Sequence, residues 1–305
     1  MRVICAEAMG VCFGVADALE VVRGIARPME VTVRGELVHN ERVMREMVER
    51  GFGVMGEVEA GRGEIPSTDI VVVTAHGVSD AERGRLEGAG KRIVDTTCPL
   101  VRRAHRAAAG LERDGYFVVV VGRRGHVEVR GLTGDLRNFV VVETALEVVE
   151  YGWERIGVMA QTTSVEQEVA GIVARVREKN PRAEVRFVNT VCGPTRERQV
   201  AMEKLLERVD VVVVVGGRNS NNTLRLVERA RECGVRAVRV EEACELREQD
   251  FLPWEVVGLT AGTSGLPEAV VGVRGWLEGF YAGDGGEFRM SESVNSEWGG
   301  MANDK

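Results

Sequence analysis

The 305-residue chain lacks the features of a membrane or exported protein. Its longest valine run covers only residues 211–215, far short of the ~20 apolar residues that a membrane-spanning helix needs. The opening sequence, MRVICAEAMG, has no basic start followed by an apolar stretch, as a secretory signal would have. The sequence therefore predicts a cytoplasmic protein that does not contact a membrane.

The chain also lacks a basic stripe and closely paired cysteines. Its formal net charge is -7, with acidic and basic residues mixed along the whole length, which argues against a nucleic-acid partner. Six cysteines are too few for a disulfide scaffold in a chain of this length. No CxxC pair occurs, which disfavours structural zinc without excluding it. Metal or catalytic use of some cysteines is the better expectation.

What the sequence does contain is a series of short valine-rich runs separated by amphipathic segments. The runs are continuous rather than alternating in polarity, as in strands buried on both faces of a parallel sheet. They cover residues 71–77, 116–126, 209–219 and 256–262. The amphipathic segments are long enough for crossover helices and cover residues 101–113, 165–179 and 195–208. The predicted fold class is therefore α/β.

Three cysteines, Cys12, Cys98 and Cys192, are each followed by two polar loops at similar distances. The first loop lies 27 or 28 positions after the cysteine, and the second lies 64 to 72 positions after it. In chain order, the candidate ligands in these loops are His39, His76, His126, Thr162, Ser220 and Ser264. Because each loop follows a run typical of a strand, the spacing indicates three related α/β units.

These units replace the two domains that chain length alone would suggest. We expect three pseudo-symmetric lobes with small, mostly parallel sheets, at residues 1–97, 98–191 and 192–282. Ligands collect at the carboxyl ends of parallel strands, so three such ends facing one another would form one central pocket. Residues 283–305 lack both helix and strand periodicity and are predicted to be a polar tail.

The three cysteines at matching positions in these units are candidate metal ligands. A lone cysteine is more often a small core residue, which is our interpretation of Cys5, Cys233 and Cys244. Three thiols at matching positions instead favour a shared site. Because iron–sulfur clusters usually take four thiolates, three would leave one iron open to a substrate oxygen. That iron could act as a Lewis acid on an alcohol while the cluster supplies electrons.

The polar loops hold three of the four histidines, and the fourth, His105, lies in a helical pattern where we expect a structural hydrogen bond. Imidazole, hydroxyl and amide groups together suit phosphate oxygens, particularly beside helix N-termini. The candidate phosphate-binding residues are His39, His76, His126, Thr162, Ser220, Asn222 and Ser264. The alternative is that GRNSNN is a loop whose serine and asparagine side chains only cap the next helix.

Glu128 lies two residues after His126 and could deliver a proton to the same pocket. Loss of hydroxide as water and protonation of a carbon skeleton both need a proton donor, for which a carboxyl group with a raised pKa is suited. The alternative is a solvated surface carboxylate.

Taken in order, these motifs resemble 4-hydroxy-3-methylbut-2-enyl diphosphate reductase, the LytB/IspH family at the end of the non-mevalonate isoprenoid pathway. The resemblance covers about residues 10–270 and runs through GVCFGV, GELVHN, TAHGVS, DTTCPLV, GHVE, QTT, NTVC, GGRNSNN and TAGTSG. It implies three pseudo-symmetric lobes and a 4Fe-4S cluster on Cys12, Cys98 and Cys192, with the substrate hydroxyl on the fourth iron. It further implies diphosphate binding by the seven residues above and proton delivery through Glu128.

The resemblance also implies two electrons from a ferredoxin or flavodoxin, with isopentenyl and dimethylallyl diphosphates as products. Three departures from the family pattern occur: Val127 replaces a proline, Asn221 replaces a serine, and the stretch after QTT is one residue shorter. Asn221 can still donate to phosphate and joins the candidates.

The competing class is a non-catalytic protein whose thiolates and a histidine hold zinc or a sensing cluster, and whose polar loops bind an anion. Turnover of the allylic diphosphate would distinguish the two.

Overall fold

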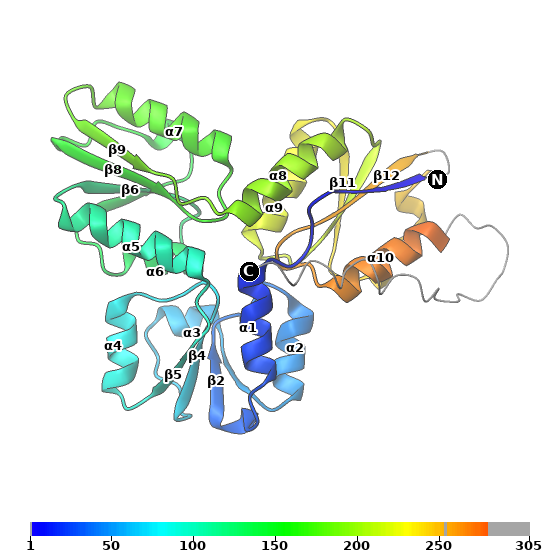
Figure 1. Cartoon of the computed structure of the whole chain (residues 1–305), viewed down its shortest axis with the longest axis horizontal. Coiled ribbons are helices and arrows are strands. Elements are labelled where there is room, and N and C mark those ends of the chain that lie inside the picture. The colour runs from blue at the N-terminus through cyan, green and yellow to red at the C-terminus, as the bar shows by residue number, and fades with distance from the viewer. Residues whose placement is uncertain (1, 253–254, 280–305) are drawn as a thin grey trace.

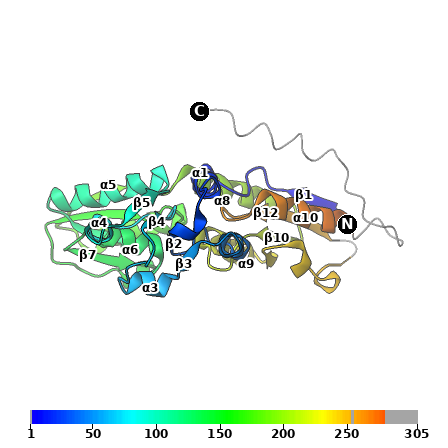
Figure 2. The same ribbon diagram turned by 90° about the horizontal axis from the view of Figure 1, so that it is seen from below.

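Three lobes meet at a common centre in the computed structural model, which describes residues 2–252 and 255–279 (Figure 1). A view turned by 90° shows that the arrangement is flat, with the lobes side by side (Figure 2). The predicted tail, residues 283–305, lies outside the described residues. Among the helices within the described ranges, none is long and apolar enough to cross a membrane.

Each lobe is built on a four-stranded sheet in which every pair of neighbouring strands is parallel. The first sheet has the order β3-β2-β4-β5, with β2 (Val31–Arg34), β3 (Gly53–Met55), β4 (Ile70–Val73) and β5 (Arg92–Asp95). The second has the order β7-β6-β8-β9, with β6 (Phe117–Val121), β7 (Phe139–Val142), β8 (Arg155–Ala160) and β9 (Glu184–Val188). The third has the order β1-β12-β10-β11, with β1 (Arg2–Cys5), β10 (Val211–Val215), β11 (Arg236–Val240) and β12 (Val256–Ala261).

Helices connect the parallel strands, as a parallel sheet requires. The helices of the first lobe are α1 (Phe13–Arg23), α2 (Glu41–Glu49), α3 (Glu57–Gly61) and α4 (Asp80–Gly88). Those of the second are α5 (Pro99–Arg113), α6 (Val127–Thr133) and α7 (Glu166–Lys179). Those of the third are α8 (Gly193–Leu206), α9 (Asn221–Glu232) and α10 (Pro267–Gly279). Short 3-10 turns lie at Pro28–Glu30, Ala145–Glu147, Ala243–Glu245 and Glu248–Asp250. The predicted α/β class and the predicted strands and helices are confirmed.

The valine runs form the central strands because helices cover both faces of each sheet. All five residues of β10 are buried, and alternate valines belong to two separate cores on the two faces of the third sheet. One of these cores continues into the first lobe, where it includes Val31, Val33 and Val72. The second lobe has cores of its own on each face of its sheet. The first and third lobes are therefore joined by shared apolar packing.

The first strand departs from the predicted division of the chain. We expected residues 1–97 to form the first lobe, but β1 pairs with β12 in the third sheet, with Arg2 opposite Val256. The predicted divisions before Cys98 and Cys192 fall between β5 and α5 and between β9 and α8. The first strand belongs to the third lobe because it supplies the fourth strand of the third sheet, just as β5 and β9 supply the fourth strands of the first and second sheets.

Candidate functional site

The site is formed by loops at the carboxyl ends of the two central strands of each sheet. Because all paired strands are parallel, these ends share one edge of each sheet, and the three edges face the centre of the molecule (Figure 1). The loops after β2 and β4 carry His39 and His76. Those after β6 and β8 carry His126 and Thr162, and those after β10 and β12 carry Ser220 and Ser264.

The three candidate metal ligands occupy equivalent positions, after the fourth strand of each sheet. Cys12, Cys98 and Cys192 are the N-cap residues of α1, α5 and α8, and none of their side chains caps its helix by a hydrogen bond. Each of these helices then packs in the next lobe along the chain. The thiols therefore lie where the chain crosses between lobes, at helix N-termini that favour negative charge.

Burial and nearby charge raise the pKa of two of the three thiols, Cys98 and Cys192. Burial is the largest cause of both shifts, and the pKa of Cys192 reaches about 11. The charges of Cys12 and Glu128 raise both pKa values further. Cys192 Sγ lies 3.0 Å from Thr195 Oγ1. Because these effects disfavour the thiolate form, a positively charged group bound beside Cys98 and Cys192 would lower the pKa of both.

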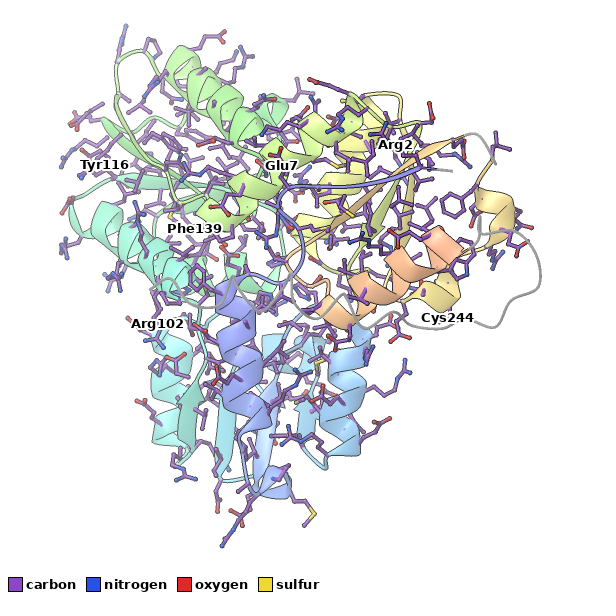
Figure 3. All side chains as sticks on the ribbon, turned by 45° about the vertical axis from the view of Figure 1, so that its right-hand side comes forward. Arg2, Glu7, Arg102, Tyr116, Phe139 and Cys244 are labelled. Carbon is purple, nitrogen blue, oxygen red and sulfur yellow. The ribbon has the colours of Figure 1, made fainter. Side chains whose placement is uncertain are left out.

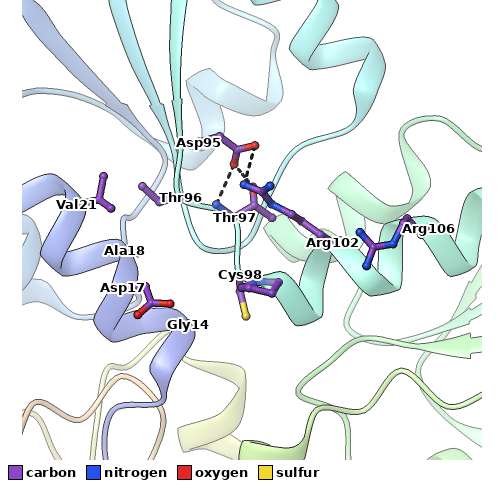
Figure 4. Close-up of a pocket in the computed structure, with 11 residues that line it drawn as sticks. Gly14, Asp17, Ala18, Val21, Asp95, Thr96, Thr97, Cys98, Arg102 and Arg106 are labelled. Atoms are coloured by element: carbon purple, nitrogen blue, oxygen red, sulfur yellow. Dashed lines mark hydrogen bonds and ion pairs between the residues drawn. The ribbon is translucent and has the colours of Figure 1, made fainter. Parts of the chain in front are cut away.

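A glycine gives Cys98 its position. A Cβ on Gly14 would lie 2.4 Å from Cys98 Sγ, so only glycine allows α1 and the Cys98 thiol to approach this closely. A cavity of about 340 Å³ reaches Cys98 from the side where α1 and the N-terminus of α5 meet (Figure 4). Its lining includes Asp17, Arg102 and Arg106. The cysteine site is therefore open to one face of the molecule.

The three loop histidines form one cluster, although they come from two lobes. The ring centroids of His39 and His76 are 4.4 Å apart, and that of His126 lies 5.2 Å from His39 and 5.7 Å from His76. His39 Nδ1 lies 2.6 Å from Glu36 Oε2. Burial, followed by the charge of His39, lowers the pKa of His126 to about 3 and that of His76 well below its usual value. His76 and His126 are therefore neutral in this state.

Glu128 is almost completely buried and is bound to the loop after β8. Its carboxylate accepts hydrogen bonds from Thr162 N at 2.7 Å and from Thr162 Oγ1 at 2.9 Å. Burial raises the pKa of Glu128 to about 7, against the smaller opposing effect of these hydrogen bonds. A solvated surface carboxylate, the alternative considered from the sequence, is excluded by an exposed fraction of 1%. Glu128 can therefore hold or release a proton near neutral pH.

The third lobe contributes a row of buried polar side chains. Ser220 caps α9 by accepting from Thr223 N at 3.3 Å, and Ser264 Oγ accepts from Gly217 N at 3.2 Å. Asn222 accepts from Thr263 N at 3.0 Å, while its buried Nδ2 has no hydrogen-bond partner among the described residues. A buried amide donor without a partner costs free energy, so its orientation suits an acceptor oxygen of a bound ligand.

Contacts between lobes hold this row against the histidine cluster. Asn40 Nδ2 donates to Ser264 O at 2.9 Å, and Asn221 Nδ2 donates to Thr163 Oγ1 at 2.9 Å. A Cβ on Gly217 would lie 1.7 Å from His39 O, so this position requires glycine. The amide of Asn221 thus joins the second and third lobes in this state, which makes it a structural contact as well as a candidate ligand.

Two residues at the site were missed by the sequence analysis. Glu36 contacts His39, and the only signal was a glutamate three residues before a histidine. Arg198 is 6% exposed and joins the loop before Cys12 to α8, donating to Gly10 O through Nε and Nη2 at 3.0 and 2.6 Å and to Pro194 O at 2.8 Å. Its place six residues after Cys192 gave no indication of that role.

Two interpretations of residues outside the site were wrong. Cys233 and Cys244 are exposed rather than core residues. Cys233 is the residue at which α9 ends, and Cys244 lies in the 3-10 turn Ala243–Glu245 at the outer side of the third lobe (Figure 3). His105 Nε2 is buried and makes no hydrogen bond among the described residues. The ring instead fills space beside Gly77 and Gly131, where there is no side chain. Cys5 packs partly buried against the core, as expected.

Comparisons with known proteins give a consistent result. The LytB protein family matches residues 3–278. A 4-hydroxy-3-methylbut-2-enyl diphosphate reductase of Anaeromyxobacter sp. is 37% identical over 92% of this chain and 98% of its own, and one of Aquifex aeolicus is 35% identical over 86% and 91%. The solved structure of the corresponding reductase from Plasmodium falciparum superposes with a TM-score of 0.79 at 25% identity, covering 88% of this chain and 86% of its own. A second solved structure, described as the terminal enzyme of the non-mevalonate pathway, is 32% identical with a TM-score of 0.64, covering 92% of this chain and all of its own.

Proposed function

The chain belongs to the LytB protein family, and from this we infer that it is the reductase of (E)-4-hydroxy-3-methylbut-2-enyl diphosphate that ends the non-mevalonate pathway. The reaction breaks the allylic C–O bond and forms one C–H bond, consuming two electrons and two protons and releasing water. Its products are isopentenyl and dimethylallyl diphosphates. The observation that carries this assignment is the single centre to which all three lobes contribute, with three thiols, a buried carboxyl group, the histidine cluster and the polar row of the third lobe.

Members of this family are iron–sulfur enzymes, and the thiols fit such a cofactor. No group of three or more His, Cys, Asp or Glu in the described ranges is spaced to hold a single metal ion. Three thiols from three lobes, coupled through their charges and placed at helix N-termini, suit the wider frame of a cluster. Cys12, Cys98 and Cys192 hold a 4Fe-4S cluster with one iron left open. When bound, the cluster supplies electrons and a Lewis-acidic iron for the hydroxyl group.

The remaining groups bind and orient the diphosphate and hold a proton. The donors are His39, His76, His126, Thr162, Ser220, Asn222 and Ser264, with Asn221 as a weaker candidate. The amide nitrogen of Asn222, which has no hydrogen-bond partner in the part of the chain that the structure describes, supports this role. Glu128 holds a proton at its carboxyl group, where a pKa of about 7 allows donation near neutral pH. Ferredoxin or flavodoxin supplies the electrons.

Anaerobic assay of the iron-loaded protein tests the proposal. The protein should show the broad visible absorption of an iron–sulfur cluster and convert the allylic diphosphate to its two products when a chemical reductant is supplied. The Cys98→Ser variant should lose the cluster and the activity together. The matched control, Cys244→Ser at an exposed cysteine, should keep both. A colourless, zinc-loaded protein that binds diphosphate without turnover would support the non-catalytic alternative and refute the proposal.

A further inference from the structure

The hydrogen bonds of the histidine cluster fix which ring nitrogen carries each proton, beginning at His126. The main-chain N–H of Glu128 donates to His126 Nδ1 at 3.1 Å, so Nδ1 carries no proton. Because burial lowers the pKa of His126 to about 3, the ring is neutral and its single proton lies on Nε2.

The same logic extends from His126 to His39 and Glu36. The two Nε2 atoms of His126 and His39 are 3.3 Å apart, so the Nε2 of His39 accepts the proton that His126 donates. The proton of His39 itself then lies on Nδ1, 2.6 Å from Glu36 Oε2. Asn219 Nδ2 donates to the other carboxyl oxygen at 3.2 Å, and the hydrogen bond with His39 lowers the pKa of Glu36. Glu36 is therefore an ionised acceptor.

Without a ligand, the lone pair of His39 Nε2 accepts the His126 proton. A bound diphosphate that took this proton as a hydrogen bond to one of its oxygens would leave the His39 lone pair facing another phosphate oxygen. Two acceptors repel unless a proton lies between them, and a carboxylate at Nδ1 stabilises the imidazolium that such a proton creates. We propose that Glu36 is a positioning residue that couples diphosphate binding to the uptake of one proton from solvent, held between His39 Nε2 and a phosphate oxygen. This inference rests on the proposed diphosphate site.

Other charged groups near His39 also respond to a bound anion, so the test must separate them. Those facing it are His76 from the loop after β4, and His126 and Glu128 at the N-terminus of α6. Arg218, beside Asn219, lies near Glu41 and Glu245 at 3.9 and 3.6 Å. Glu128 titrates near pH 7 and would add proton uptake of its own. Comparing variants in a Glu128→Gln background removes that contribution.

Glu36→Gln is the informative substitution because it reverses the direction of one hydrogen bond. The amide oxygen can still accept from Asn219, which turns the amide N–H toward His39 Nδ1. His39 then carries its proton on Nε2 while neutral and can donate to phosphate without gaining one. Binding should therefore persist in Glu36→Gln while the proton uptake is lost. Glu49→Gln, at the exposed end of α2, is the matched control.

Calorimetry measures this proton uptake. The cluster-loaded protein is titrated with the allylic diphosphate, without reductant, in two buffers of different ionisation enthalpy. At about pH 8 a free imidazole and a free phosphate ester are both deprotonated. The Glu128→Gln protein and its Glu49→Gln derivative should take up about one proton per diphosphate, with affinity falling up to ~10-fold per pH unit above neutrality. The Glu36→Gln derivative should take up almost none and bind with little pH dependence.

The outcomes separate this inference from the function on which it rests. Equal proton uptake with and without Glu36 would overturn the inference and leave the diphosphate site intact. Absence of any diphosphate binding by the unmodified, cluster-loaded protein would overturn both. Loss of the cluster in Glu36→Gln, measured as iron content, would show that Glu36 acts on the metal site instead and would also refute the inference.

Discussion

Replacing Glu128 by Gln is expected to separate proton delivery from binding and to reverse the usual effect of a mutation on stability. Both carboxyl oxygens are bound by Thr162, at 2.7 and 2.9 Å. A glutamine fits the same contacts, because its oxygen can accept from Thr162 N and its amide can donate to the Thr162 hydroxyl. The cluster and diphosphate affinity should therefore be retained, while turnover falls at least ~100-fold, the lower end for loss of a general acid.

The effect on stability follows from the raised pKa of Glu128. Burial moves this pKa from 4.5 to about 7. Between those values the folded protein binds more protons than the unfolded chain, so the free energy of unfolding falls as pH rises through that interval. A shift of this size corresponds to about 3 kcal/mol. Because glutamine carries no charge, Glu128→Gln should be more stable than the unmodified protein above about pH 8 by up to about 3 kcal/mol, and equally stable below about pH 4.

Two measurements check this prediction. Turnover is assayed anaerobically with chemical reductant in excess, so that chemistry limits the rate, and unfolding by denaturant is followed at high and low pH. Glu150→Gln, an exposed glutamate of the same lobe, is the control and should change neither quantity. Near-normal turnover in Glu128→Gln would show that the proton comes from another group. A variant less stable than the unmodified protein at high pH would show that the buried carboxylate is not destabilising.

Three further predictions concern the ligands and the close contact between lobes. Cys98→Ser should lose most of its iron, measured by metal analysis, whereas Cys233→Ser at an exposed position should keep it. His76→Ala should weaken diphosphate binding, measured by calorimetry, while iron content stays unchanged; loss of iron with affinity retained would indicate a metal ligand instead. Gly217→Ala should also weaken diphosphate binding, by at least ~10-fold, because a Cβ 1.7 Å from His39 O must displace one of the two loops; unchanged affinity would contradict this.

Much of the fold was predictable because its local signals are strong. Runs such as Val211–Val215 can be buried only between two helical layers, and the spacing of Cys12, Cys98 and Cys192 reflects a repeated order of strands. The loop residues were predictable for the same reason, since each follows a central strand whose carboxyl end faces the centre. A repeat seen in sequence is here a repeat of topology.

What could not be predicted depends on contacts between distant segments. The pairing of β1 with β12 joins the first and last of the described strands. The four residues of β1, one exposed and three partly buried, carry no signal for which sheet they will enter. From the sequence, Arg198 is expected to be an exposed cation, but in the structure it donates to Gly10 O in the loop before Cys12. Glu36 lies only three residues before His39, but the second partner of its carboxyl group, Asn219, approaches from the third lobe. Local sequence patterns do not encode such proximity.

The position of β1 has a consequence for how the chain reaches its native state. Among the described strands β1 is made first and its partner β12 last, so the backbone hydrogen-bonding groups of β1 stay without these partners until residues 256–261 have been made. Pairing of such distant segments slows folding. The loop that carries Cys12 follows β1 directly, so the thiol can join the other two only after the ring of lobes has closed. Cluster insertion should accordingly be a late event in folding, after β12 has been made and has paired with β1.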